Sequence, residues 1–444
     1  MGQIVRKNRK SILMELSDDK NREEAMKKIQ RSIIFVIGIL LWVMQGQSVF
    51  AAGSTELLSG TIANTTISYR LTEDGTLTIY SDNIEEMPNY TVNSTVPWAA
   101  QKDKIKKVQI NSYLKNIGDY AFYGCDSLES VVIQDSKLTE IGIAAFKNCK
   151  NLKTINIPET VKAIGTMGFA NCNSLQSTKK NPVVISKGNT EIMDFAFAGC
   201  KSMQYIKIPA SVEMIGNCAF FECDFLSEIE IEEGQLQEIG DYAFTDCDME
   251  SIVIPTKTGK IGEYAFSDCK RLEKIWFLYA NGTDTQDIAD NMLQGSSHVN
   301  ALYVYSGKSY ESWAKNNGLS DKITYIHNMS GDNSNYKVYL GGVPYGQYSA
   351  VYNGQQIKPA VKLYYSGKEV SAADYSVAYS NNVNAGNQAA IQIVGKNAYY
   401  GKMSLKFTIK QYSLTSNCKI SDVQNQSYTG YAITPKISVM CGNC

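Results

Sequence analysis

Seven of the eleven cysteines recur at nearly regular intervals, and thiols have the widest possible chemistry of any residues in this chain. A thiol could form a disulfide, bind a metal ion or fill a hydrophobic core. The intervals of 24, 23, 28, 23, 24 and 22 residues place one thiol in each structural unit, whereas a metal needs several around one point. Cysteines of adjacent units would be close enough to form disulfides. However, their side chains would run parallel, and seven cysteines cannot all pair, so we favour a ladder of buried free thiols. The seven are Cys125, Cys149, Cys172, Cys200, Cys223, Cys247 and Cys269.

Three of the four remaining cysteines stand at positions that can be interpreted, and they offer little chemistry. Cys218 occupies a position that carries tyrosine in three other units, so it is an isolated substitution. Cys441 and Cys444 form a CxxC pair, a spacing found in redox and zinc sites. No second pair and no βαβ pattern accompanies them, so we assign this pair no metal and no redox role.

Other features argue against catalysis and against nucleic acid. His298 and His327 are the only histidines, which leaves little for a His-based metal site or a Ser-His-Asp triad. The sequence contains no nucleotide-binding loop, zinc-protease helix, nucleophile elbow or calcium loop. Lys and Arg total 43 against 44 Asp and Glu, and a net charge of -1 creates no field that attracts nucleic acid. We therefore expect no enzyme activity, no cofactor and no nucleic-acid partner.

The thiols are positioned by a sequence unit of about 23 residues that recurs seven times. The first copy reads IGDYAFYGCDSLESVVI from Ile117, and the second reads IGIAAFKNCKNLKTINIP from Ile141. In the first half, Ile117, Ala121, Phe122 and Cys125 recur at helical spacing, which predicts a short helical turn with one buried face. The second half ends in an alternation of apolar and other residues, which predicts a strand. One unit cannot bury its apolar face alone, so we expect the copies to stack into a solenoid.

The recurring pattern IGxxAFxxCxxLxxIxIP resembles the bacterial leucine-rich repeats of the BspA type. The resemblance implies an α/β solenoid of short parallel strands and short helical turns. It places an N-terminal cap at residues 53–116, seven repeats at 117–280 and a C-terminal cap at 281–330. It also implies binding to host matrix proteins and to other cells. The longest interval contains the insertion QSTKKNP, residues 176–182, which we expect to form a surface loop.

After Ser330 the chain changes to short alternating strands separated by turn residues. The segment Tyr428–Pro435 repeats Tyr352–Pro359 at an offset of 76 residues. This arrangement resembles the tandem immunoglobulin-like modules of proteins exported by Gram-positive bacteria. We therefore expect an all-β immunoglobulin-like sandwich at residues 331–411 and a truncated second copy at 412–444.

The N-terminal segment has the composition of an export signal. Its apolar run, Ile33–Met44, is shorter than the roughly 20 residues of a membrane span. The basic stretch MKKIQR begins at Met26 before the run, and small residues follow it up to Ala52. We interpret residues 1–52 as a signal peptide region in which translation starts at Met26. The mature fragment should then have no membrane span and be secreted or surface-attached, in a Gram-positive-type bacterium.

The outward side chains of the predicted strands form the candidate binding face. If Val131 and Ile133 point into the core, the residues beside them point outward, because strand side chains alternate. The outward positions vary in chemistry, and they include large aromatics, which are typical interface anchors. We predict that a partner contacts Ser130, Val132, Thr154, Asn156, Tyr205, Lys207, Glu228, Glu230, Ser251, Val253, Lys274 and Trp276.

Together these features favour an adhesin-like display scaffold. Its partner would be an extracellular protein or glycan on host or neighbouring cells. Two alternatives stay open from the residues. The chain could be the non-catalytic front end of an extracellular enzyme whose catalytic domain lies beyond Cys444, or it could be a structural cell-wall spacer.

Overall fold

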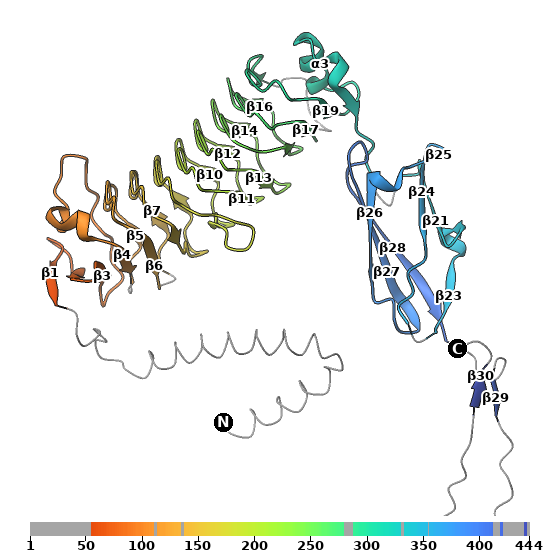
Figure 1. Ribbon diagram of the computed structural model, residues 1–444, viewed down its shortest axis with the longest axis horizontal. Helices are drawn as coiled ribbons and strands as arrows, with labels where there is room; N and C mark the ends of the chain where they lie inside the picture. Colours follow the sequence, from red (N-terminus) through yellow and green to blue (C-terminus); the bar gives the residue numbers. More distant parts are fainter. Residues whose placement is uncertain are drawn as a thin grey trace, which may run out of the picture. The chain divides into compact units, whose positions relative to one another are not determined.

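A computed structural model of the chain describes residues 55–110, 113–134, 137–278, 287–329, 333–353, 355–411, 418–420 and 439–441. The predicted signal peptide region lies outside these residues. Of the predicted second module, β29 (Cys418–Ile420) and β30 (Val439–Cys441) are described, and they pair antiparallel. Within the described ranges no helix is long and apolar enough to cross a membrane. The chain forms a stack of coils and, after it in sequence, a β-rich module (Figure 1).

Most coils contribute one parallel strand to a first series, in which all strands but β8 have three to five residues. This arrangement confirms the predicted parallel solenoid. The register pairs like residues, for example Val108 with Val131 and Ile252 with Ile275. Strands β1 (Glu56–Thr61) and β2 (Ser68–Thr72) precede the series. Its members are β3 (Thr76–Tyr80), β4 (Lys107–Ile110), β6 (Ser130–Ile133), β8 (Thr154–Ile155), β11 (Tyr205–Ile208), β13 (Glu228–Ile231), β15 (Ser251–Ile254), β17 (Lys274–Phe277), β19 (Ala301–Val304) and β20 (Ile323–Tyr325).

A second series of two-residue strands belongs to the same coils. Each begins a sequence unit, and its isoleucine is buried in every coil from Ile117 to Ile261. Two residues are too few for an alternating pattern, so the sequence did not predict these strands. They are β5 (Asn116–Ile117), β7 (Glu140–Ile141), β9 (Ala163–Ile164), β10 (Glu191–Ile192), β12 (Met214–Ile215), β14 (Glu238–Ile239), β16 (Lys260–Ile261) and β18 (Asp287–Ile288).

The segment between the isoleucine and the cysteine of each unit is not the predicted helical turn. Two residues per coil have positive φ, as at Tyr242 (55°) and Asp246 (59°), and such residues interrupt a right-handed helix. The N–H groups of Tyr242 and Phe244 donate to carbonyls of the next coil, whereas the N–H of Thr245 donates back to Tyr242. The segment is a series of tight turns that also links adjacent coils. Its buried positions have the same spacing as a helical face, so the spacing alone could not distinguish the two.

The phenylalanines of the units form a continuous aromatic stack along the core. Neighbouring rings lie 5.1–5.6 Å apart, and their planes differ by 10° or less. Trp98, which precedes the turn η1 (Ala99–Lys104), continues the stack onto Phe122 at 5.5 Å. Its indole N–H donates to the Ala121 carbonyl at 2.9 Å. Trp98 therefore covers the first ring of the stack and satisfies its own buried polar group.

The glycine after the isoleucine allows adjacent coils to approach closely. A Cβ atom at Gly165 would lie 2.7 Å from backbone atoms of Gly142 and Ile143. At Gly240 it would lie 2.8 Å from the backbone nitrogen of Asn217. Both distances are well inside van der Waals contact, so any larger residue would push the coils apart.

The stack of coils extends past residue 280, where the sequence analysis placed its end. Strands β18 and β19 pair in register with β16 and β17. Ser296 stands at the cysteine position of this eighth coil, and its hydroxyl donates to the Phe266 carbonyl at 2.6 Å. The segment predicted as the C-terminal cap therefore begins with one more repeat. The sequence pattern did not identify this repeat, because it has serine in place of cysteine.

The helix α3 (Ser309–Asn316) and the turn η2 (Ser320–Lys322) follow the eighth coil. Tyr310 of α3 stacks on Phe277 at 4.0 Å, and its hydroxyl donates to the Thr258 carbonyl at 2.9 Å. Strand β20 then pairs with β19. This short helix supplies aromatic side chains that close the apolar interior after the last coil.

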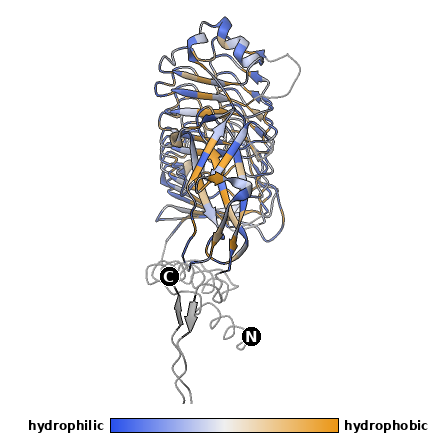
Figure 2. Ribbon diagram, turned by 90° about the vertical axis from the view of Figure 1, so that its right-hand side faces the viewer, coloured by the Kyte–Doolittle hydropathy of each residue, from blue (hydrophilic) through white to orange (hydrophobic). Residues whose placement is uncertain are grey.

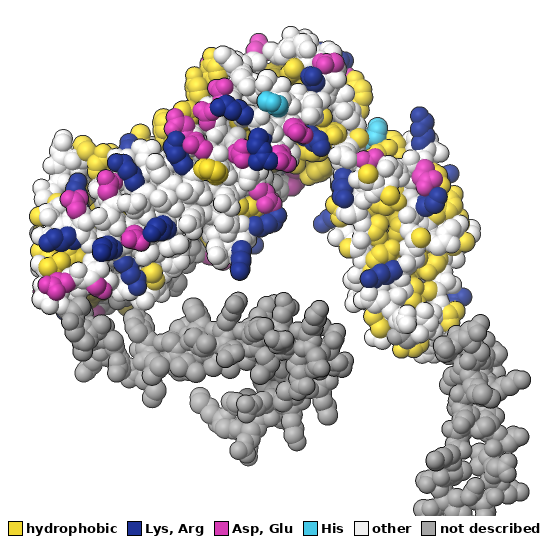
Figure 3. Space-filling view, viewed as in Figure 1, with side chains coloured by type: hydrophobic (Ala, Val, Ile, Leu, Met, Phe, Trp, Pro, Cys, Tyr) yellow, Lys and Arg dark blue, Asp and Glu magenta, His cyan; other side chains and the backbone are white. Residues whose placement is uncertain are grey.

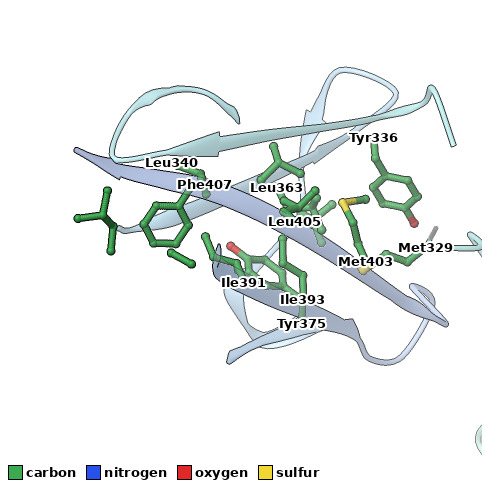
Figure 4. Packing of buried hydrophobic residues seen from close by; sticks show 14 residues of the cluster. Met329, Tyr336, Leu340, Leu363, Tyr375, Ile391, Ile393, Met403, Leu405 and Phe407 are labelled. Carbon is green, nitrogen blue, oxygen red and sulfur yellow. The ribbon is translucent and has the colours of Figure 1, made fainter. Parts of the chain in front are cut away.

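Residues 333–411 form two four-stranded sheets around one core (Figure 4). Leu340 and Leu363 enter this core from one sheet, and Ile391 and Phe407 enter it from the other. Hydrophobic and hydrophilic residues alternate along these strands (Figure 2). The all-β module is present, and its immunoglobulin-like character stays a prediction. The elements are β21 (Tyr336–Leu340), β22 (Val343–Pro344), η3 (Tyr345–Gln347), β23 (Ser349–Val351), β24 (Val361–Tyr365), β25 (Lys368–Glu369), η4 (Ala372–Asp374), β26 (Tyr375–Ser380), β27 (Gly386–Gly395) and β28 (Lys402–Lys410).

Candidate partner-binding face

The outward residues of β6 and β8 lie in successive coils, as the alternation predicts. Ser130 and Val132 are half-buried on β6, and Thr154 is exposed on β8. Asn156 has a different role. Its side-chain amide accepts from the Ile133 N–H at 2.8 Å and donates to the Ile133 carbonyl at 2.7 Å. The side chain of Asn156 therefore replaces backbone pairing where β8 has ended.

The insertion at residues 176–182 forms a surface loop, as predicted, and it also contacts the strand face. At its base the buried Ser177 hydroxyl donates to the Tyr205 carbonyl at 2.5 Å. From its exposed tip, Lys179 forms an ion pair with Glu228, and its ammonium lies 5.8 Å from the centre of the Tyr205 ring. Only 6% of Tyr205 is exposed. The expectation of an exposed Tyr205 is wrong, because alternation along a strand does not reveal what a distant loop covers.

The residues after Tyr205 form a hydrogen-bonded charge network with the next coil. The Lys207 ammonium lies 2.8 Å from a Glu230 oxygen and 2.7 Å from a Glu232 oxygen. The Tyr205 hydroxyl donates to the other Glu230 oxygen at 2.8 Å. The hydrogen bond from Lys207, followed by that from Tyr205, lowers the pKa of Glu230, and the bond from Lys207 also lowers that of Glu232. The same bonds raise the pKa of Lys207, so the three charges persist at neutral pH.

The side chains that make these contacts come from the insertion loop, from β11 and from the coil of β13. We call this group of six side chains the strand-face network. Each exposed ion pair in such a network stabilises the fold by only about 0–1 kcal/mol. Its larger effect is to hold polar groups in place before a partner arrives, which reduces the entropy lost on binding. Charged side chains of both signs are interspersed over the visible face of the coils (Figure 3). The network comprises Lys179, Tyr205, Lys207, Glu228, Glu230 and Glu232.

The repeat pattern matches the model of a known family. Residues 99–188 and 190–314 match, in six copies, the model of the BspA type leucine rich repeat region. This part of the chain is similar to BspA-type leucine-rich repeats. No curated protein matches the chain.

Solved structures of leucine-rich repeat proteins from several bacteria are similar to this chain. A leucine-rich repeat protein from Eubacterium ventriosum shares 20% identity over 60% of this chain and 85% of its own, with a TM-score of 0.36. One from Bacteroides ovatus shares 20% identity over 66% and 84%, with a TM-score of 0.39. A leucine rich cell surface protein from Faecalibacterium prausnitzii shares 21% identity over 61% and 94%, with a TM-score of 0.28.

In the last coils of the stack, the strand face around Trp276 is occupied. The Trp276 ring stacks on Tyr303 at 4.5 Å, and its indole N–H donates to the Asn397 carbonyl at 2.9 Å. Val253 packs in the same hydrophobic cluster, to which Tyr400 also belongs. Trp276 is therefore not the free aromatic anchor that the sequence predicted. Asn397, which accepts its hydrogen bond, lies 121 positions further along the chain, where no repeat pattern points to it.

Four of the twelve predicted contact residues meet in the strand-face network, namely Tyr205, Lys207, Glu228 and Glu230. Sequence reasoning missed Lys179, which lies in the insertion, and Glu232, which follows the end of β13. The sequence did contain a signal for these ion pairs, because the insertion carries two lysines and a nearby strand is rich in glutamate. Ser251 is exposed and Lys274 is half-buried on neighbouring strands. Partner contact by any of the twelve stays a prediction.

The seven repeat cysteines are free thiols buried in the core, as the sequence analysis favoured. From the second copy onward, each thiol donates to the phenylalanine carbonyl of the preceding coil at 3.1–3.3 Å, as Cys223 does to Phe197. Burial raises the pKa of these thiols, to about 12 at Cys223. Among the residues that the structure describes, no three His, Cys, Asp or Glu side chains are grouped to hold a metal ion.

Proposed function

We propose that this chain is an extracellular binding scaffold, displayed at the cell surface, that contacts a protein or glycan partner through the strand-face network. Stacked repeats offer an extended surface on which variable side chains can be presented without altering the core. The composition of residues 1–52 supports a location outside the cell. The proposal requires no catalytic step and no cofactor.

The observation that carries the proposal is the fixed position of the network. Lys207 contacts two carboxylates of the next coil, and Lys179 reaches the same coil from the insertion. The insertion is the one interruption of an otherwise regular series of cysteine intervals, and it is folded onto this part of the face. A surface of mixed charge with a buried tyrosine beneath it suits recognition by hydrogen bonds and shape more than long-range attraction.

The test is a surface-binding assay of the secreted protein against matrix proteins and glycans, with the variant Lys207→Ala. We expect this change to weaken binding by about 1–3 kcal/mol, because it removes two charge-assisted contacts and frees two carboxylates. The melting temperature should change little, because the Lys207 side chain is 43% exposed.

The matched control is Lys201→Ala, in the same coil. Lys201 is 40% exposed and also pairs with two acids of the next coil, Glu222 at 3.6 Å and Asp224 at 3.1 Å. It lies directly after Cys200, in the turn segment rather than on β11. If Lys201→Ala weakens binding and Lys207→Ala does not, the partner contacts the turn segments and the proposed site is wrong.

A further inference from the structure

The β-rich module has a surface cavity of about 800 Å³. Its walls are the end of β26, the loop that follows, the first residues of β27, and Gln356 from the segment before β24. Ligand sites in proteins have volumes of about 300–1,000 Å³, so the cavity is large enough for a small ligand. The function proposed above makes no use of it.

The lining of the cavity is polar and uncharged. Six of its eleven residues are asparagine or glutamine, and none of the eleven is charged. Gln356, Asn381 and Asn384 are exposed, and among the described residues their side chains have no hydrogen-bond partner. The amide groups of these three side chains are therefore available to a ligand.

Hydrogen bonds hold the two walls of the cavity together. The Asn382 backbone carbonyl accepts the Ile357 N–H at 2.9 Å, and the Asn382 side-chain amide donates to the Ile357 carbonyl at 2.9 Å. Only 3% of Asn382 is exposed. The Tyr379 hydroxyl donates to the Pro359 carbonyl at 2.6 Å. These bonds fix the loop against the segment of Gln356, so a ligand would meet a wall that is already formed.

A β-bulge brings two more amides to the cavity. Gly386 of β27 pairs with Ile409 and Ala389 pairs with Phe407, so Asn387 and Gln388 together stand opposite a single residue of β28. The Gln388 amide nitrogen donates to the Asn387 amide oxygen at 3.2 Å. A bulge changes the direction of side chains and is common beside functional sites. Here it places two neighbouring exposed amides in the wall.

The chemistry of this wall selects a neutral ligand that is rich in hydroxyl groups. A side-chain amide both donates and accepts hydrogen bonds, and so does a hydroxyl group. A charged ligand would lose hydration without meeting an opposite charge in the lining. A fully apolar ligand would leave the amides unpaired. The C–H groups of a sugar ring can pack on Tyr379 and on Val383, which is 39% exposed.

We propose that the cavity between the β26–β27 loop and Gln356 binds a neutral oligosaccharide. A peptide would also bring amides, but its side chains would need apolar pockets or charges that the lining does not provide. The site lies in the β-rich module and not on the strand-face network, so it is independent of the function proposed above.

The test is an array of linear hexasaccharides probed with the labelled full chain, with titration calorimetry of any that is retained. The neutral members are maltohexaose, cellohexaose, mannohexaose and xylohexaose, and hexagalacturonate carries a carboxylate on every ring. We expect at least one neutral member to bind, and hexagalacturonate to bind at least about tenfold more weakly. Binding of no neutral member, or tighter binding of hexagalacturonate, would overturn the proposal.

Variants of the wall locate the site. Gln388→Ala and Asn384→Ala each remove one exposed amide and should weaken binding of the retained oligosaccharide about threefold to tenfold. Ala385→Trp should fill the cavity and abolish binding, and a melting curve checks that it is folded. The matched control is Gln392→Ala, an exposed glutamine of β27 outside the cavity, which should bind as the parent does. If Gln392→Ala weakens binding as much as Gln388→Ala, the sugar lies on the open strand and not in the cavity.

The variant Lys207→Ala separates this site from the strand-face network. It should bind the retained oligosaccharide as the parent does, because Lys207 lies on β11 and does not line the cavity. Lost binding in Lys207→Ala with unchanged binding in Gln388→Ala would assign the sugar to the strand-face network and overturn the site in the module. The reverse result would support the site in the module, whatever partner the strand-face network binds.

Discussion

The Cys172 thiol donates a hydrogen bond to the Phe146 carbonyl of the preceding coil across 3.1 Å. Ser296 makes the corresponding contact to Phe266 in the eighth coil across 2.6 Å. The position therefore requires a small side chain that can donate a hydrogen bond, and it does not require thiol chemistry. The Phe146 carbonyl also accepts the Cys149 N–H at 3.1 Å, so it keeps one partner when the thiol is removed.

A substitution series at Cys172 tests this interpretation. Cys172→Ser should cost about 1 kcal/mol of unfolding free energy, because it keeps the donor and loses the larger sulfur atom. Cys172→Ala should cost about 1–2 kcal/mol through the lost bond and a small cavity. Cys172→Asp should cost several kcal/mol, because it places an unpaired charge among buried apolar residues. Urea unfolding of the three variants measures the order, and a serine as damaging as the aspartate would contradict a donor role.

The buried thiols also predict how stability depends on pH. Burial raises the pKa of Cys172 well above the ordinary value of 9.0, and it raises that of Cys223 to about 12. Above about pH 9 the unfolded chain loses thiol protons that the folded chain retains. Stability that is fully present below pH 9 should therefore fall as the pH rises towards 12, by about 1.4 kcal/mol per pH unit for each buried thiol.

The urea midpoint of the parent and of Cys172→Ser, followed from about pH 8 to about pH 10, checks this dependence. The serine variant should lose stability less steeply, because one titrating thiol has been removed. Cys218→Ser is the control, since Cys218 is only partly buried and its pKa is raised less strongly than that of Cys172. Parallel curves for the parent and Cys172→Ser would show that the thiols ionise equally in both states.

The core of the repeats was predictable because apolar residues recur at fixed positions of the unit, and those positions are the buried ones. Val131, Ile133 and Cys125 are inside, as their apolar character and spacing indicate. The turn segments were not predictable as turns, because a helix and a series of turns bury residues at the same intervals. The positive φ of Tyr242 leaves no mark in the sequence, since tyrosine is not a residue that favours it.

The candidate site was less predictable than the core, because exposure depends on segments far away in sequence. Tyr205 is outward on its strand, yet the insertion covers it through Lys179. The eighth coil escaped notice because Ser296 replaces the cysteine that marks every other copy. Periodicity identifies what faces the core, and tertiary contacts decide which outward residues remain free.

The predicted export signal leads to a test that concerns residues outside the described ranges. The apolar run Ile33–Met44 is followed by small residues at Ala51 and Ala52. We expect the secreted protein to begin at Ala52 or Gly53. N-terminal sequencing of protein from the culture medium checks this, and an intact Met1 or Met26 terminus would exclude cleavage.

Because Trp276 contacts other parts of the chain, we expect it to contribute to the stability of the fold and not to partner binding. Its ring stacks on Tyr303, and its N–H reaches the Asn397 carbonyl between β27 and β28. Trp276→Ala should therefore lower the unfolding free energy by about 1–3 kcal/mol, through lost aromatic packing and a lost hydrogen bond.

Two further variants separate the parts of this effect in urea unfolding of the full chain. Trp276→Phe keeps a ring on Tyr303 and removes the N–H donor, so its loss should be near 1 kcal/mol, smaller than that of the alanine variant. Ser251→Ala, an exposed outward position on the neighbouring strand β15, should change stability by less than about 0.5 kcal/mol. If Trp276→Ala is no less stable than Ser251→Ala, the tryptophan does not join the last coils to the segment around Asn397, and its ring is available to a partner after all.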